Sequence, residues 1–237
     1  MIWGISSFTY GWNIGIDHHQ PAKTMSVFDL VQQTLDFELS CLQIGDNLPL
    51  HLLPESLLQM LKQQINQHQI RLEIGARGLT PGHLDTFLKL AAFLDAPLVR
   101  FVIDSVGYEP DDQEVEAIIK GFLPQLHQQN CTLGIENHDR FKARDLARII
   151  RNIDDERVGI CLDCANSLGA GEGLEWVTKQ LAPYTVNLHI KDFTIERFNH
   201  KMGFLIEGCP VGKGMMELAW MQQELARRTA PDPAALG

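Results

Sequence analysis

Residues 158–163 read Val-Gly-Ile-Cys-Leu-Asp, and this stretch decides the fold. In an extended chain its three large apolar residues point to one side, and its glycine, cysteine and aspartate point to the other. Residues 132–136 and 186–191 divide in the same way. An open, doubly wound sheet is apolar on both faces. A barrel has helices on its outer face and small or polar side chains inside, so the alternation favours a barrel.

Apolar, β-rich segments of this kind recur at intervals of roughly 26 to 36 residues, the length of one strand-and-helix unit. Helical periodicity fills the intervals; Leu146, Ile149 and Ile150, for example, share one helix face. Pro124 is expected to bend or shorten the helix in which it lies. The chain is therefore predicted to be a single (β/α)8 barrel domain over residues 1–237. The predicted strands lie at 2–6, 41–45, 70–77, 98–104, 132–137, 158–163 and 186–192.

The eighth strand of that barrel has no counterpart in this pattern. By the spacing it should begin near Thr229, where the chain reads Thr-Ala-Pro-Asp-Pro shortly before Gly237. The prediction is thus a barrel whose strand eight is missing or truncated.

The composition is that of an ordinary globular protein, with 45% hydrophobic and 21% charged residues. Acidic residues outnumber basic ones by 30 to 20, and there is no long run of lysine or arginine. We therefore expect no nucleic-acid partner, because binding to phosphates depends on those two residues. No apolar run approaches the roughly 18 residues that cross a bilayer, and no signal peptide is visible. A cytoplasmic protein with reduced cysteines and no membrane partner is expected, and a homo-oligomer is compatible with the sequence.

Three consecutive predicted strands end in polar residues on the inward side: Glu136, Asp163 and His189. In a (β/α)8 barrel the active site lies at the carboxyl ends of the strands. Two carboxylates and one imidazole suit one divalent metal ion, namely Mn²⁺, Co²⁺, Mg²⁺ or Zn²⁺. Two alternatives remain open. Asp163 could cap the next helix, and His189 could be a core residue that donates to a backbone carbonyl.

Two further features near these strand ends also have more than one interpretation. Lys191 faces inward, yet it could form a simple surface ion pair with Asp192. Cys161 and Cys164 form an isolated C-x-x-C, which could serve redox chemistry or zinc binding, although a zinc ribbon needs a second pair. Two small residues near a strand end explain the pair better. By the same alternation, the last predicted strand turns three large apolar residues toward the helices: Val186, Leu188 and Ile190.

Four motifs follow one another at intervals of one strand. They are Ile135-Glu136-Asn137-His138, then Cys161-Leu162-Asp163-x-x-Asn166, then Leu188-His189-Ile190-Lys191-Asp192, then Gly203-Phe204-x-x-Glu207-Gly208-x-Pro210-x-Gly212-x-Gly214. In this order they resemble the sugar phosphate isomerase/epimerase family, part of the xylose-isomerase-like TIM-barrel superfamily. The resemblance spans the chain in pattern, and its informative motifs lie between Glu136 and Gly214.

In the family that the chain resembles, one divalent cation is held by Glu, Asp, His and a second Glu from four successive strands. The resemblance implies that Glu136, Asp163 and His189 are the first three of these ligands. The fourth belongs to strand eight. Glu207 lies in the segment after strand seven, so the resemblance does not make it a ligand. The family often has a histidine where this chain has Asn166.

The reaction that the resemblance implies is proton transfer next to a carbonyl. The metal would stabilise an enediolate as a Lewis acid, and Glu136 would act as general base and acid. Epimerisation needs a second carboxylate on the opposite face of the substrate, which strand eight would supply. The predicted function is a metal-dependent isomerase or epimerase of a sugar, sugar phosphate or related polyol. The residues expected to bind this small polyhydroxylated substrate are Asn137, His138, Asn166, Lys191 and Arg77.

Arg77 could bind a phosphate or carboxylate of the substrate, or it could pair internally with Glu73. Other functions are compatible with the same residues. A lyase or dehydratase acting on a polyol or hydroxy acid would use the same metal site, and a non-catalytic barrel could simply hold a sugar. The superfamily also includes a metal-dependent apurinic endonuclease, which the acidic composition disfavours.

Overall fold

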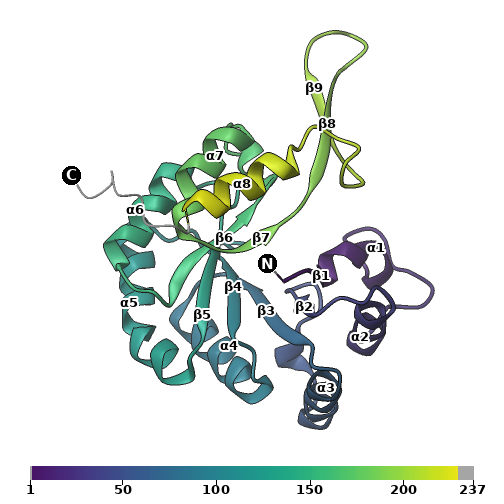
Figure 1. The fold of residues 1–237 in the computed structure, drawn as a ribbon, viewed down its shortest axis with the longest axis vertical. Coiled ribbons are helices and arrows are strands. Elements are labelled where there is room, and N and C mark those ends of the chain that lie inside the picture. Colours follow the sequence, from purple (N-terminus) through teal and green to yellow (C-terminus); the bar gives the residue numbers. More distant parts are fainter. Residues whose placement is uncertain (1, 229–237) are drawn as a thin grey trace. The chain divides into compact units, whose positions relative to one another are not determined.

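The computed structural model describes residues 2–228, and its strands follow the predicted repeat (Figure 1). Seven parallel strands form one sheet in the order β1 to β7, so each strand lies beside its neighbour in sequence. The strands are β1 Gly4–Ser6, β2 Cys41–Ile44, β3 Arg71–Arg77, β4 Leu98–Val102, β5 Thr132–Glu136, β6 Val158–Asp163 and β7 Thr185–His189. All seven predicted strands are therefore confirmed in position. The place where strand eight was expected, 229–237, lies outside the described residues.

The chain divides into two compact units, Met1–Leu133 and Gly134–Gly237. Helices of the first unit begin where the sequence supplies caps: the Ser26 hydroxyl accepts the Asp29 N–H, and the Thr80 hydroxyl accepts the His83 N–H. The helices of this unit are α1 Gly11–Ile14, α2 Val27–Asp36, α3 Glu55–Gln67, α4 Pro81–Leu94 and α5 Asp112–Gln129, with short 3-10 turns η1 Ser7–Tyr10 and η2 Leu50–Leu52.

Helix α5 runs through Pro124, so this proline does not shorten its helix, and the alternative that it bends the helix stays a prediction. Proline removes one helical N–H and frees one carbonyl, that of Lys120. Both Pro124 and Lys120 are exposed, so water can satisfy that carbonyl. Val115, Ile119 and the rest of the apolar face remain buried and hold the helix in place.

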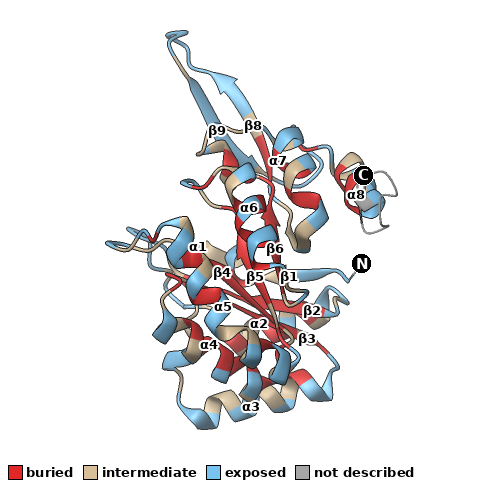
Figure 2. Ribbon diagram, turned by 90° about the vertical axis from the view of Figure 1, so that its left-hand side faces the viewer, coloured by how far each residue is buried: buried red, intermediate tan, exposed pale blue. Residues whose placement is uncertain are grey.

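The second unit carries the predicted site. Its helices are α6 Ala143–Ile153, α7 Leu174–Leu181 and α8 Leu218–Arg228, with 3-10 turns η3 Asn166–Leu168 and η4 Ala182–Tyr184. Strand β6 is buried along its whole length, whereas the hairpin of β8 Asp192–Arg197 and β9 Phe204–Cys209 is largely exposed (Figure 2). The seventh predicted strand was expected to reach Asp192; in the structure it ends at His189, and Asp192 begins the hairpin.

A β-bulge in β7 corrects another expectation. Ile160 pairs with Thr185, but the next residue, Cys161, pairs with Asn187, so Val186 is an extra residue in β7. A Cβ added to Gly159 would clash with the Val186 side chain, which places Val186 on the glycine side of the strand. The prediction that Val186 faces the helices is therefore wrong. The bulge also brings Asp163 and His189 into register as direct neighbours.

None of the helices within residues 2–228 is both long and apolar enough to cross a bilayer. The single-domain organisation over residues 1–237 stays a prediction.

Candidate metal centre

Glu136, Asp163 and His189 come together at the carboxyl ends of β5, β6 and β7 in the second unit. His189 Nδ1 lies 3.6 Å from Glu136 Oε2 and 3.7 Å from Asp163 Oδ2. Asp163 is fully buried, Glu136 is 6% exposed, and the His189 side chain is 15% exposed. One imidazole nitrogen therefore faces two carboxylates in a largely buried setting.

The two carboxylate oxygens of Asp163 have different tasks. Oδ1 accepts the N–H groups of Ala165 and Asn166, both at 2.9 Å, and so caps the turn η3. Oδ2 lies 2.7 Å from Lys191 Nζ and faces His189. The alternative that Asp163 caps the next element thus holds for one oxygen, while the other faces the cluster. Burial by itself raises the pKa of Asp163, but His189, Lys191 and the Ala165 N–H outweigh it and lower the pKa to about 2.

Side chains surround both nitrogens of the His189 ring. Nδ1 faces the carboxylates, and Nε2 lies 3.3 Å from Cys161 Sγ. Burial by itself lowers the pKa of His189. The neighbouring Cys161 and the carboxylates of Asp163 and Glu136 outweigh this effect and raise the pKa well above its ordinary value.

Two predicted substrate-binding residues border the cluster. The Asn166 amide donates to Glu136 Oε1 at 2.8 Å and accepts from Lys191 Nζ at 3.2 Å. Lys191 is exposed and also contacts Asp163 Oδ2. Asn166 therefore links the Glu136 carboxylate to the Lys191 ammonium. The Asn166 amide and the Lys191 ammonium both lie next to the cluster.

The other three predicted substrate-binding residues are placed differently. Asn137 is fully buried; its Nδ2 donates to the carbonyl of Asp163 at 3.0 Å and its Oδ1 accepts the Asp163 N–H at 2.7 Å, so it ties two strand ends together. His138 Nδ1 lies 3.1 Å from Asp139 Oδ2. Arg77 ends β3 in the first unit and pairs with Asp46 at 3.7 Å.

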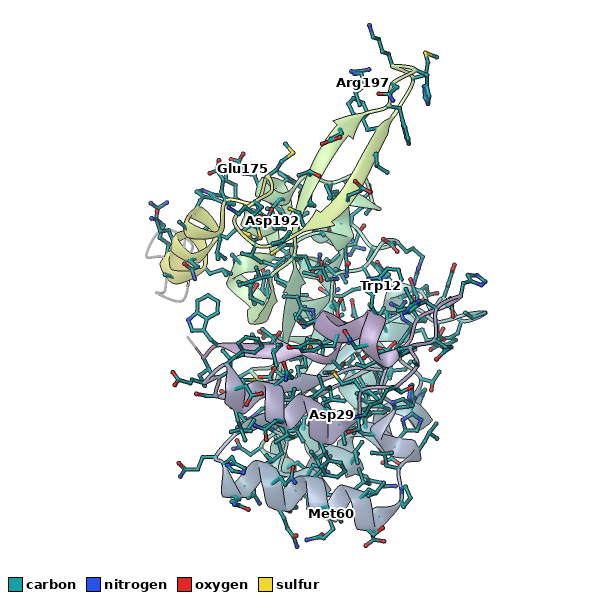
Figure 3. All side chains as sticks on the ribbon, turned by 90° about the vertical axis from the view of Figure 1, so that its right-hand side faces the viewer. Trp12, Asp29, Met60, Glu175, Asp192 and Arg197 are labelled. Atoms are coloured by element: carbon teal, nitrogen blue, oxygen red, sulfur yellow. The ribbon has the colours of Figure 1, made fainter. Side chains whose placement is uncertain are left out.

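Asp192 does not form the surface ion pair with Lys191 that was left open. Asp192 is buried, and its carboxylate accepts four backbone N–H groups at 2.8 to 2.9 Å, those of Phe193, Gly212, Gly214 and Met216. Figure 3 shows Asp192 at the base of the β8–β9 hairpin. A Cβ at Gly214 would clash with the Asp192 carboxylate, which explains the glycine there. Asp192 therefore fastens the chain that returns from the hairpin.

We expect Asp192→Ala to destabilise the hairpin base. Four N–H groups would lose a charged acceptor, and the open state of residues 193–216 should become at least about tenfold more populated. Backbone N–H donation, led by Met216, lowers the pKa of Asp192 below 3.8. Its contribution is thus present above that pH and is lost as the pH falls through the lowered pKa. Limited proteolysis and thermal unfolding at pH 7, repeated as the pH is lowered stepwise, check this. Glu196→Ala, an exposed change on the same hairpin, should have little effect.

The part that Cys161 plays in this site was not predicted from the sequence. Glu136, Cys161 and His189 each offer a ligand atom, and these atoms lie within 4.8 Å of one another. The alternation had placed Cys161 on the inward side with Asp163. The alternation within one strand does not give the register between β6 and β7, and this register brings the thiol beside the His189 ring.

Comparison with known proteins agrees with this architecture. Residues 82–236 match the model of the xylose isomerase-like TIM barrel family. The 3-oxo-isoapionate decarboxylase of Pectobacterium atrosepticum is 31% identical over 222 residues, which cover 94% of this chain and 80% of that protein. The chain belongs to the xylose isomerase-like TIM barrel family, as its motifs predicted.

Solved structures of low sequence identity share the fold. A xylose isomerase-like TIM barrel protein from Mycobacterium smegmatis, in complex with magnesium, matches with a TM-score of 0.74 at 12% identity, over 96% of this chain and 86% of that one. The D-psicose 3-epimerase of Clostridium cellulolyticum H10 matches with a TM-score of 0.72 at 14% identity, over 98% and 82%.

The residues present fit a divalent cation. Metal–ligand distances of about 2.0–2.2 Å place neighbouring ligand atoms roughly 3 to 3.5 Å apart. The separations of His189 Nδ1 from the two carboxylate oxygens, 3.6 and 3.7 Å, are close to that range and longer than hydrogen bonds. A cation between them would also offset two buried negative charges.

Proposed function

We propose that this chain is a divalent-metal-dependent lyase that decarboxylates a small polyhydroxylated 3-oxo acid through an enediolate. The observation that carries the proposal is the cluster of Glu136, Asp163 and His189 with the Lys191 ammonium 2.7 Å from Asp163. The 31% identity to the decarboxylase over 94% of the chain supports the choice of substrate class. The metal ligands remain those predicted from the sequence: Glu136, Asp163 and His189.

In a 3-oxo acid the keto group lies two carbons from the carboxylate. When the bond to the carboxylate breaks, its electron pair moves onto the neighbouring carbon and the keto oxygen, and CO₂ leaves. Because that neighbouring carbon carries a hydroxyl in the proposed substrates, the resulting anion is an enediolate. A bound divalent cation supplies Lewis acidity that stabilises the negative charge on that oxygen. The carbon then takes one proton, which Glu136 delivers as its carboxylic acid and regains from solvent. The reaction consumes one proton in total.

Each neighbouring group has a task in this scheme. Lys191 is exposed and cationic, so it can bind the substrate carboxylate before it leaves. The Asn166 amide donates to Glu136 Oε1 and thereby orients the acid. Asp163, whose pKa is lowered to about 2, stays ionised and suits a ligand better than a base.

This assignment explains why a single proton-transfer residue suffices. Decarboxylation delivers one proton to one face of the carbon. Epimerisation needs a second acid–base group on the opposite face. Among the described residues of the cluster, Glu136 is the carboxyl group suited to moving a proton, because Asp163 is held ionised by Lys191, His189 and backbone N–H groups.

An isomerase or epimerase of a sugar, sugar phosphate or related polyol is the second candidate. The same enediolate would form if Glu136 removed a proton from carbon instead of returning one. Similarity of fold to the D-psicose 3-epimerase favours it, at 14% identity.

The test separates these functions by their products. Metal-loaded protein would be incubated in D₂O with 3-oxo sugar acids labelled in the carboxyl group, and separately with ketoses. Release of labelled CO₂ with one deuterium incorporated supports the decarboxylase. Deuterium exchange into a ketose without CO₂ release supports the epimerase. Tight sugar binding without either reaction would mean that the barrel is a binding protein.

We expect Lys191→Met to lower kcat/KM for a 3-oxo acid by about 10- to 100-fold, the value of one charge-assisted contact. The metal content should not fall, because Lys191 is not a ligand and its removal takes one competing positive charge away from Asp163. Lys179→Met, which removes a surface ion pair with Glu175, is the matched control and should leave the rate unchanged. Steady-state kinetics beside elemental analysis checks both. An unchanged kcat/KM in Lys191→Met would remove Lys191 from the substrate site.

A further inference from the structure

The His189 ring lies between two different kinds of neighbour. Its Nδ1 faces the Glu136 and Asp163 carboxylates at 3.6 and 3.7 Å. Its Nε2 lies 3.3 Å from Cys161 Sγ, which in turn lies 3.3 Å from the Asn187 side-chain oxygen. Cys161 is fully buried. The carboxylates and the thiol therefore contact different nitrogens of one imidazole.

Which group donates and which accepts in each of these contacts follows from the number of hydrogens on the thiol. A thiol has one hydrogen, and Cys161 donates it to Asn187 Oδ1. The sulfur can then only accept toward the imidazole, so His189 Nε2 carries the hydrogen and donates it. When a cation takes the place of a proton on Nδ1, the ring is neutral, Nε2 keeps its hydrogen, and Nδ1 offers its lone pair. That lone pair points to the carboxylates, where a cation would bind.

We propose that Cys161 is a positioning residue that holds His189 in the tautomer and orientation in which Nδ1 binds the metal. A chain of hydrogen bonds runs from Asn187 through Cys161 to the His189 ring. The bulge at Val186 creates this arrangement, because the bulge pairs Cys161 with Asn187 and Asp163 with His189. Carboxylates and carbonyls commonly orient metal-bound histidines in this way; here a thiol relayed to an amide does so. The consequence for metal binding rests on the proposed function.

A direct ligand role for Cys161 is the competing assignment, since its sulfur lies near Glu136 and His189. The geometry argues against it. A metal ion uses one nitrogen of a given imidazole, and the nitrogen next to both carboxylates is Nδ1, whereas the sulfur contacts Nε2. A thiolate ligand would also favour softer metals than the carboxylates do.

Three variants test the proposal, with metal affinity measured by competition against a chromophoric chelator for Mn²⁺ and Zn²⁺. Cys161→Ala removes the acceptor and should weaken binding at least about tenfold. Cys161→Ser keeps both a donor and an acceptor and should stay within about threefold of the parent. Cys164→Ala is the matched control: it removes a buried thiol three residues away whose sulfur contacts Met221, and it should bind metal like the parent.

Two further measurements distinguish a failure of the positioning role of Cys161 from a failure of the proposed function. In metal-free protein, ¹⁵N-detected imidazole spectra should show a slowly exchanging His189 Nε2 proton in the parent and in Cys161→Ser, and a rapidly exchanging one in Cys161→Ala. With Co²⁺ bound, the parent should lack an intense sulfur-to-metal charge-transfer band in the near ultraviolet.

The outcomes separate the two proposals. If the parent binds no divalent metal, the proposed function fails, and the His189 spectra alone decide on Cys161. If Cys161→Ala matches the parent in both metal affinity and Nε2 exchange, Cys161 does not position His189. A charge-transfer band that Cys161→Ala abolishes would make Cys161 a ligand and overturn the positioning role.

Discussion

Replacing Glu136 with glutamine should lower kcat by about 10³-fold or more. Glutamine cannot deliver or accept a proton on carbon, and general acid–base catalysis contributes about 10²- to 10⁴-fold by itself. The same change removes one negative charge beside His189 Nδ1, where Glu136 Oε2 lies 3.6 Å away. Metal affinity should also fall, because Glu136 is one of the three proposed ligands; at saturating metal the remaining loss should appear mainly in kcat, because substrate contacts through Lys191 and Asn166 remain.

Stopped-flow or coupled assays of CO₂ release would measure this loss, with Glu175→Gln as the matched control. Glu175 is an exposed residue of α7 that pairs with Lys179 (Figure 3). Its replacement removes the same charge from the same unit without touching the cluster. A Glu136→Gln variant that retains more than about one tenth of the parental kcat would exclude Glu136 as the proton-transfer residue.

Replacing Asp163 with alanine should weaken binding of the divalent metal by about 10²- to 10³-fold, the share of one ligand in a site of three or four. Oδ2 of Asp163 faces His189 and lies in the fully buried part of the cluster. Because its pKa is lowered to about 2, the carboxylate is ionised at every pH at which the protein would be assayed. Turnover should fall with metal occupancy and return in part at high metal concentration.

Elemental analysis by plasma mass spectrometry, beside chelator competition, checks this prediction. Asp145→Ala removes a carboxylate of α6 that pairs with Arg148, and it should leave metal content unchanged. A Glu136→Ala/His189→Ala double variant should lose the metal altogether. Equal metal content in Asp163→Ala and the parent would mean that the Lys191 ammonium alone neutralises Asp163, and that the cation is held elsewhere.

Local patterns were enough to predict most of the fold. Strand-and-helix repeats depend on nearest neighbours along the chain, so the positions of all seven strands could be predicted. Pro124 shows the limit of that reasoning, because solvent exposure at Lys120 decides whether a proline ends a helix, and exposure is a tertiary property.

The candidate site likewise has features that follow from each strand alone and features that depend on pairing between strands. Strand alternation placed Glu136, Asp163 and His189 on one face, since each residue's side follows from its own strand. How two strands align is a matter of pairing between them. The bulge at Val186 sets that alignment, and it decides that Asp163 lies beside His189 and Cys161 beside Asn187.

The sequence by itself determined the repeat of strands and helices, the family and the three polar residues that meet at the strand ends. Only the tertiary structure decided which partner each of them has: Lys191 pairs with Asp163 and not with Asp192, and Asp192 binds the hairpin base. The contact between Cys161 and the His189 ring was also decided by the tertiary structure. Side-chain direction is a local property of backbone geometry, whereas hydrogen-bond partners lie many residues apart and depend on register and burial.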